Sequence, residues 1–235
     1  MCYDKRNTHS LLPMLSKAQE KRIRSLHRKK ARRELGECLV EGANVIEAAG
    51  GAVEFTFTPK DTEAFVKLVT TQSPQAVAGV AKIPSFTLDD VMKERTVVVL
   101  DGVQDPGNVG AILRACLAFD GALVLIESAD PTNSKVVRSS AGTMFLVPWV
   151  EMKRQEALEW LSQVSRPLFR LERHDTAITH DKQTSDPAIL IAGSEGLGIQ
   201  LVIDAPSLTI AHNDTLESLN VAQAVTIALA FRKST

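Results

Sequence analysis

The chain has 235 residues, 44% of them hydrophobic and 23% charged, which is ordinary for a soluble protein with one large or two modest domains. No stretch reaches the roughly 20 apolar residues of a membrane span, and residues 1–10 lack the apolar region of a secretory signal. The three cysteines and five histidines show no metal-ligand spacing. We therefore expect a cytoplasmic protein without membrane contact, disulfide framework or metal.

The net charge of −1 conceals a basic segment over residues 17–33, which holds nine of the 27 Lys and Arg residues and one acid, Glu20. A cationic block on an otherwise acidic chain favours a polyanionic partner, and a solvated helix face is the alternative. The side chains that we expect to contact RNA are Lys17, Lys21, Arg22, Arg28, Lys29, Lys30, Arg32 and Arg33.

A small α/β unit is expected over residues 16–83, after a loose leader over residues 1–15. Ser16 and Gln19 have the spacing of a capping box, which predicts one basic surface helix up to about Arg33. A linker over residues 84–95 follows this unit. Within the α/β unit, hydrophobic patterning predicts strands over 38–40, 52–58 and 76–81, and helices over 43–49 and 61–69.

The pattern changes at residue 96, where TVVVLD (residues 96–101) is typical of a strand covered on both faces. Strands and helices then alternate, which predicts an α/β domain with a mostly parallel sheet over residues 96–235. The last helix is apolar almost all round, so we expect it to be buried between the sheet and a second copy, in a homodimer. The expected strands are 122–127, 145–150, 168–171, 188–193 and 207–211, and the expected helices are 111–119, 135–142, 153–164 and 218–231.

Three polar loops follow strands, at the edge where open α/β sheets bind ligands. DGVQDPGNVGAILR (residues 101–114) contains Asn108, a candidate helix cap, and Arg114. IAGSEGLGI (191–199) contains three glycines and Glu195, and IAHNDTLESLNVAQA (210–224) places Ser218 and Asn220 before the last helix. Each loop alone is also compatible with an ordinary turn. The absence of GxGxxG and of a P-loop argues against an unrelated nucleotide-dependent enzyme.

Together and in this order, the three segments closely resemble motifs 1, 2 and 3 of the SpoU (TrmH-type) RNA ribose methyltransferases of the SPOUT superfamily. DPGNVGAILR matches motif 1, GSEGLG matches motif 2, and ESLNVAQA matches motif 3. SSAGTMFLVP (residues 139–148) resembles the segment between them, so the resemblance covers residues 96–231. RKKARRELGECLVEG more weakly resembles the L30e-like RNA-binding domain that many members carry.

The resemblance implies a deep trefoil knot, a homodimer whose two subunits complete each active site, and S-adenosylmethionine as methyl donor. It implies transfer to a ribose 2′-hydroxyl of RNA, with ribosomal RNA preferred over transfer RNA because the L30e-like extension is typical of the ribosomal enzymes. Arginine stays protonated, so we expect Arg114 to orient the hydroxyl and a phosphate at least as much as to accept a proton. By motif position, the catalytic residues are Arg114, Asn108, Glu195 and Asn220, and the cofactor contacts are Gly193, Ile210, Leu219, Ser218 and Thr143.

The third loop departs from the family pattern. Motif 3 commonly begins Ile-Pro-Met and has a glycine before Ser-Leu-Asn, whereas residues 210–214 here read IAHND. The change alters the backbone freedom of a cofactor loop, so a catalytically weak or inactive RNA-binding protein on the same fold is the alternative function. We interpret His212 as a surface histidine, with a ligand contact as the alternative.

Overall fold

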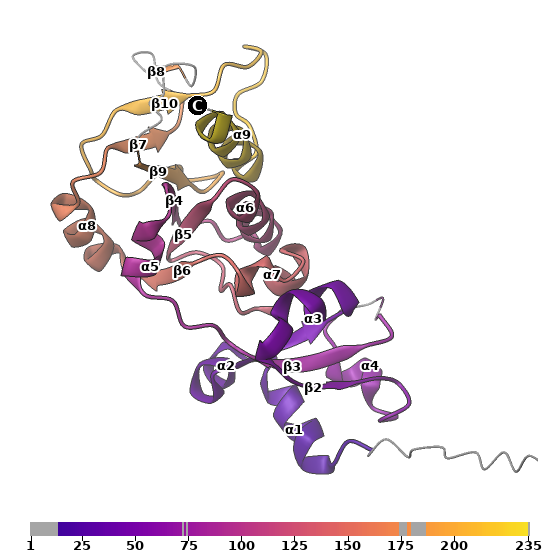
Figure 1. Ribbon diagram of the computed structural model, residues 1–235. Coiled ribbons are helices and arrows are strands. Elements are labelled where there is room, and N and C mark those ends of the chain that lie inside the picture. Colours follow the sequence, from indigo (N-terminus) through magenta and orange to yellow (C-terminus); the bar gives the residue numbers. More distant parts are fainter. Residues whose placement is uncertain (1–13, 72, 74, 174–177, 180–186, 235) are drawn as a thin grey trace, which may run out of the picture.

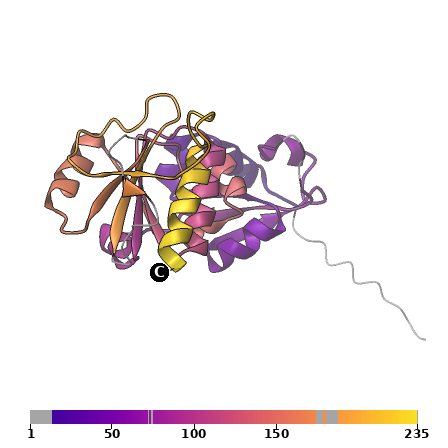
Figure 2. The same cartoon turned by 90° about the horizontal axis from the view of Figure 1, so that it is seen from above.

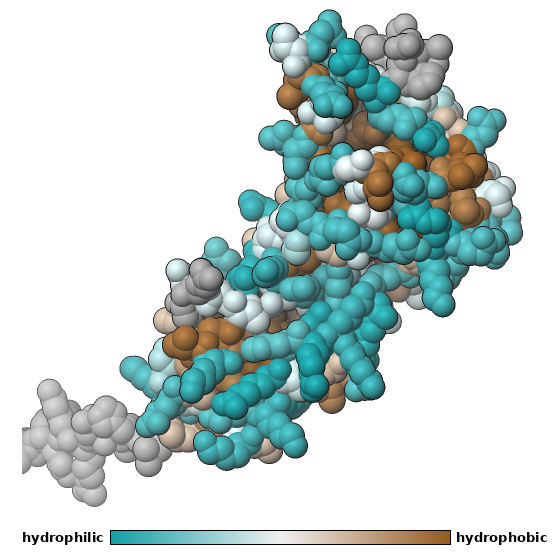
Figure 3. Space-filling model, turned by 180° about the vertical axis from the view of Figure 1, so that it is seen from behind, coloured by the Kyte–Doolittle hydropathy of each residue, from teal (hydrophilic) through white to brown (hydrophobic). Residues whose placement is uncertain are grey.

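The computed structural model describes residues 14–71, 73, 75–173, 178–179 and 187–234. The leader expected over residues 1–15 lies almost entirely outside the described residues. A small N-terminal unit packs end to end against a larger sheet domain (Figure 1). Seen from behind, the surface is largely hydrophilic, with smaller apolar patches on both units (Figure 3). No helix in the described ranges is long and apolar enough to cross a bilayer.

The N-terminal unit is built on a three-stranded antiparallel sheet with the order β1-β3-β2. One face of the sheet packs against α1 and α4, through Ile23 of α1, Leu26 at the C-cap of α1 and the edge-to-face rings of Phe57 and Phe65. The other face packs against α3. The elements are α1 (Lys17–Ser25), α2 (Lys29–Leu35), β1 (Glu37–Glu41), α3 (Ala43–Ala49), β2 (Val53–Phe57), α4 (Phe65–Leu68) and β3 (Ala78–Lys82).

Two helix predictions in this unit are wrong. The capping box of Ser16 and Gln19 is present, but the single basic helix is divided, because Arg28 is extended and starts α2 in a new direction. The helix predicted over residues 61–69 shortens to α4. Asp61 and Thr62 use their side chains to accept backbone N–H groups of Thr58 and Ala64 instead, and such local bonds favour a turn over a helix.

The sheet domain has seven described strands in the order β6-β5-β4-β9-β7-β10-β8, all of them paired in parallel. Helices cover both faces (Figure 2): α6, α7 and α9 lie on one side, α5 and α8 on the other. The strands are β4 (Thr96–Asp101), β5 (Gly121–Ile126), β6 (Trp149–Met152), β7 (Leu168–Leu171), β8 (Ile178–Thr179), β9 (Ala188–Gly193) and β10 (Ser207–Thr209). The helices are α5 (Leu88–Lys93), α6 (Pro106–Ala118), α7 (Ser134–Ser139), α8 (Arg154–Gln163) and α9 (Val221–Ser234), with a 3-10 turn η2 (Thr143–Phe145).

The mostly parallel α/β sheet expected from the sequence is confirmed, with shifted helix starts. The helix α6 begins at Pro106 because the Asp105 carboxylate caps it, accepting the backbone N–H of Asn108 at 2.8 Å. Asn108 is therefore not the cap but a first-turn residue. The helix α9 begins at Val221 rather than Ser218. Strand order does not test the trefoil knot, and the knot stays a prediction.

The two units share one continuous core. Cys38 and Val40 of β1 pack into the same apolar cluster as Val137 and Met144 of the sheet domain. At the contact, Gly142 has φ +82°, and a Cβ there would lie 2.7 Å from the Cβ of Ala48. The expected linker also contains the helix α5. The N-terminal unit is thus held firmly against the sheet domain.

Candidate active site

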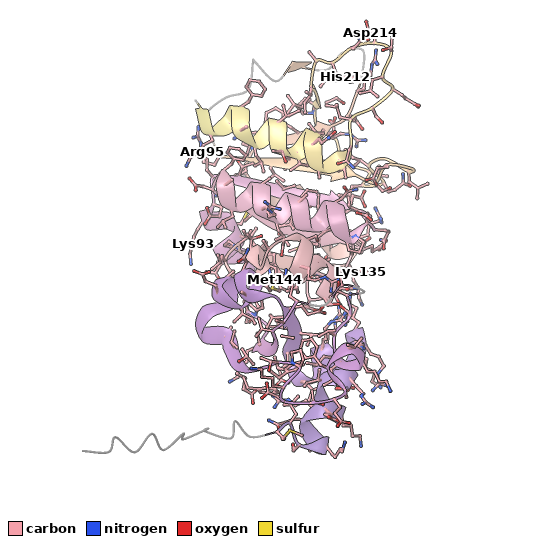
Figure 4. All side chains as sticks on the ribbon, turned by 90° about the vertical axis from the view of Figure 1, so that its right-hand side faces the viewer. Lys93, Arg95, Lys135, Met144, His212 and Asp214 are labelled. Carbon is pink, nitrogen blue, oxygen red and sulfur yellow. The ribbon has the colours of Figure 1, made fainter. Side chains whose placement is uncertain are left out.

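The three motif loops meet at one edge of the sheet. The strands β4 and β9 are parallel neighbours, so their carboxyl ends lie together, and α9 packs beside α6 (Figure 4). The Asn108 Nδ2 group donates a hydrogen bond to Glu195 Oε1. The Asn220 Nδ2 group donates to Asn108 Oδ1 at 3.0 Å. One polar side chain from each motif therefore joins a single group, the amide–carboxylate cluster of Asn108, Glu195 and Asn220.

Helix starts hold two members of this cluster in place. Asn108 lies in the capped first turn of α6. The Asn220 Oδ1 atom accepts the backbone N–H groups of Ala222 at 3.0 Å and Gln223 at 3.3 Å, which caps α9. Glu195 and Asn220 are exposed and Asn108 is half-buried. The cluster is therefore preorganised and open to a ligand from solvent.

Gly193 ends β9 at a position that no other residue can occupy. A Cβ on Gly193 would lie 2.1 Å from the carbonyl carbon of Gly198, far inside contact distance. The backbone N–H of Gly198 donates to Ser194 O at 2.9 Å, which closes the tight turn that presents Glu195. The close approach explains the glycine at this place in motif 2.

Asp101 is a positioning residue that the motif comparison did not select. Its side chain is fully buried at the end of β4. One carboxylate oxygen accepts the backbone N–H groups of Gln200 at 2.5 Å and Leu201 at 2.7 Å, and the other accepts from Arg154 at 2.5 Å. Asp101 thereby holds the chain that leaves the motif 2 loop. A carboxylate at the end of an otherwise apolar strand is the sequence signal that could have identified it.

An open cavity lies beside the cluster, between the end of β7 and the motif 3 loop. Ile210, Ser218 and Leu219, three of the five predicted cofactor contacts, line it, and Asn220 of the cluster follows Leu219 directly. The other lining residues are Leu171, Glu172, Arg173, Leu208, Thr209, His212, Glu217 and Ala224.

The other two predicted cofactor contacts do not line this cavity. Gly193 lies at the neighbouring strand end described above. Thr143 lies in η2, which packs against α3 and α6 at the contact between the two units. It is 9% exposed. The structure thus places Thr143 in the contact between the units, away from this cavity, and its cofactor contact stays a prediction.

His212 is not the surface histidine that we favoured from the sequence. It is half-buried in the cavity wall, with Nδ1 2.7 Å from the carbonyl oxygen of Ile210. Its Nε2 atom is buried and has no hydrogen-bond partner within the described ranges. A polar group of this kind fits a site that receives a ligand carrying a hydrogen-bond donor.

Arg114 lies apart from the cluster that it was predicted to serve. It is exposed on α6, more than one turn beyond Asn108, and forms no hydrogen bond or ion pair with any residue that the structure describes. Leu117 of α6 and Phe231 of α9 are each 43% exposed. The outer surface of this helix pair thus combines a free guanidinium with apolar side chains.

The basic segment is largely neutralised by internal partners. Arg32 is 4% exposed and pairs with Asp130 at 2.5 Å, so its predicted RNA contact is wrong. Burial opposes the charge on Asp130, but hydrogen bonds from Thr132 and Arg32 outweigh it and lower the pKa of Asp130. Among the other predicted contacts, Arg22 binds Glu37 and Glu54, Lys29 and Arg33 bind Glu151, and Lys30 binds Glu34.

Other side chains of this segment keep charges that face solvent. Lys21 and Arg28 are exposed and form no ion pair with a described residue, and the Lys17 side chain is 96% exposed despite its contact with Glu20. No group of three or more His, Cys, Asp or Glu side chains suited to a metal ion occurs among the residues described. A reaction without metal stays a prediction.

Comparison with known proteins matches this geometry. Residues 95–230 fit the model of the SpoU rRNA Methylase family. The chain is 29% identical over 241 residues to an uncharacterized tRNA/rRNA methyltransferase of Synechocystis sp., covering 89% of this chain and 88% of that relative. It is 28% identical over 229 residues to the 23S rRNA (guanosine(2553)-2′-O)-methyltransferase RlmP of Bacillus subtilis, covering 87% and 91%.

The fold has a solved counterpart of the same extent. An AdoMet-bound rRNA methyltransferase from Sinorhizobium meliloti superposes with a TM-score of 0.82 and 24% sequence identity. The match covers 95% of this chain and 97% of that one, and so includes the N-terminal unit.

Proposed function

Because the chain belongs to the SpoU rRNA methylase family, we propose that it transfers a methyl group from S-adenosylmethionine to a ribose 2′-hydroxyl in ribosomal RNA. The relative RlmP, named as a 23S rRNA 2′-O-methyltransferase, covers nearly the whole chain and supports this substrate over transfer RNA. The observation that carries the proposal is the joining of Asn108, Glu195 and Asn220 beside the cavity of Ile210, Ser218 and Leu219.

The cavity suits S-adenosylmethionine in both its apolar and its charged parts. Leu171, Leu208 and Leu219 offer apolar walls to a nucleoside, and Glu217 offers a negative charge to the ammonium of an amino-acid group. The bound cofactor supplies a methyl group that its positively charged sulfur has already activated.

The amide–carboxylate cluster would place the ribose. A neutral hydroxyl is a poor nucleophile and needs close, in-line placement and a proton acceptor. Asn108 donates to Glu195 and accepts from Asn220, so its amide is fixed in one orientation. The exposed Glu195 and Asn220 then shape the edge at which the ribose arrives.

A second copy would complete the site. Arg114 lies on the exposed surface of α6, apart from its own cluster. We assign Leu117 and Phe231 to a homodimer contact that brings Arg114 to the cluster of the other subunit. There the planar guanidinium would orient the hydroxyl and a neighbouring phosphate.

The N-terminal unit, which we assign to the L30e-like class, would bind RNA outside the reactive site. Lys17, Lys21 and Arg28 keep exposed charge for phosphate contacts, which lose affinity as salt rises. On the same proposal, we assign the protein to the cytoplasm.

The test is methyl transfer from labelled S-adenosylmethionine to unmodified ribosomal RNA and, separately, to transfer RNA. Wild-type protein should label ribosomal RNA at 2′-hydroxyl positions. Arg114→Ala should abolish transfer while cofactor binding persists, and Arg114→Lys, which keeps the charge but loses the planar fork, should recover little. Full activity of Arg114→Ala would exclude the assigned role.

The altered loop over residues 211–214 motivates one alternative, an RNA-binding protein without transferase activity. Wild-type protein that binds ribosomal RNA but neither S-adenosylmethionine nor S-adenosylhomocysteine in calorimetry would favour this alternative.

A further inference from the structure

Two buried side-chain polar atoms of the described residues lack a hydrogen-bond partner: Thr143 Oγ1 and His212 Nε2. Thr143 is enclosed at the contact between the two units. His212, in contrast, lies in the wall of the cofactor cavity, on the loop that precedes α9 (Figure 4). A buried polar atom without a partner is unfavourable, and a ligand that supplies the missing partner removes that penalty.

The hydrogen bond on the other side of the ring fixes what Nε2 can do. His212 Nδ1 lies 2.7 Å from the carbonyl oxygen of Ile210, and a carbonyl oxygen can only accept. The proton of the neutral imidazole therefore resides on Nδ1, and Nε2 presents a lone pair. The missing partner must be a hydrogen-bond donor.

The chemistry of the cavity favours one donor of the cofactor over the others. Leu171, Leu208, Ile210, Leu219 and Ala224 form apolar walls that suit a flat ring. The ammonium group of the cofactor would be drawn to the exposed carboxylate of Glu217, because charged groups form the stronger pairs, whereas the Glu172 carboxylate is already bound by Arg170. The neutral donors that remain for His212 are the 6-amino group of the purine and the ribose hydroxyls, and the apolar walls favour the flat purine.

Resting on the function proposed above, we propose that His212 is a cofactor-specificity residue, whose Nε2 accepts a hydrogen bond from the 6-amino group of adenine. His212 stands where the family pattern commonly has the methionine of Ile-Pro-Met, and a thioether is only a weak acceptor. This chain would thus use a side chain to recognise the purine edge within its unusual third loop.

The experiment compares S-adenosylhomocysteine with its 6-deamino analogue, in which hydrogen replaces the amino group, by calorimetry. Wild-type protein should bind S-adenosylhomocysteine about 10-fold more tightly than the analogue, the effect of one buried hydrogen bond. His212→Met should reduce this preference to less than about 3-fold. His212→Gln, whose side-chain oxygen can accept, should keep part of the preference. Ala211→Ser, at an exposed neighbour outside the cavity lining, serves as the matched control, and thermal unfolding checks that each variant folds.

An unchanged preference in a folded His212→Met variant would overturn the assignment while leaving the proposed function intact. The assignment would also be overturned if His212→Met instead lost the preference for S-adenosylhomocysteine over its 2′-deoxyribose analogue, because the partner of His212 would then be a ribose hydroxyl. Failure of wild-type protein to bind S-adenosylhomocysteine at all would overturn the proposed function and this inference together.

Discussion

The basic segment of residues 17–33 and the amide–carboxylate cluster are both rich in polar groups, but they use them differently. In the basic segment, Arg22 and Arg32 are bound to carboxylates, and Arg32 is buried where the two units meet. In the cluster, Asn108 joins Glu195 and Asn220 at an exposed edge beside a cavity. The contrast teaches that a basic run in the sequence does not by itself predict a binding surface, because carboxylates elsewhere in the fold can bind its charges.

The largest effect that separates the two regions should come from Arg32. Arg32→Met leaves Asp130 buried without its cation, which should lower the free energy of unfolding by about 3–5 kcal/mol. Arg33→Met, in the same helix, removes an exposed pair and should cost less than about 1 kcal/mol. Urea unfolding followed by circular dichroism measures both. Equal losses of unfolding free energy in the two variants would mean that the buried pair of Arg32 with Asp130 stabilises the fold no more than the exposed pair does.

The next effect should appear in catalysis rather than stability. Asn108→Ala removes both side-chain hydrogen bonds that join the cluster, so the reacting hydroxyl should be misplaced and the rate of methyl transfer should fall about 100-fold. Single-turnover assays measure the rate, and calorimetry with S-adenosylhomocysteine should show unchanged cofactor binding. If affinity falls in step with the rate, the cluster belongs to the cofactor cavity instead.

The smallest effect should appear in the dependence of the unfolding free energy on pH. The pKa of Asp130 is lowered in the folded protein, because hydrogen bonds from Thr132 and Arg32 outweigh burial. Its contribution to stability is therefore complete above the unfolded-state pKa, about 4, and is lost as the pH falls through the lower folded value. The difference in unfolding free energy between wild type and Asp130→Asn should shrink below about pH 4. An exposed control, Asp204→Asn, should differ little from wild type throughout, and a constant Asp130 difference would contradict the argument.

The sequence predicted those parts of the molecule that depend on local patterns. The run TVVVLD became β4, the helix predicted over residues 43–49 is α3, and the meeting of three loops follows from parallel strands that end at one edge. Arg32 was misassigned because its partner Asp130 lies 98 positions away. His212 was misassigned for a related reason: its sequence neighbours do not reveal which side of the ring the cavity leaves unpartnered.

The hydrogen bond from Leu201 to Asp101 closes a loop of 100 residues, and this separation bears on how the chain is synthesised. The strand β4 lies between β5, which is made soon after it, and β9, which is made much later. One edge of β4 therefore stays unpaired on the ribosome until β9 emerges. An exposed strand with this apolar, β-branched sequence tends to pair with other chains. The growing protein must therefore keep the free edge of β4 away from such strands until β9 pairs with it.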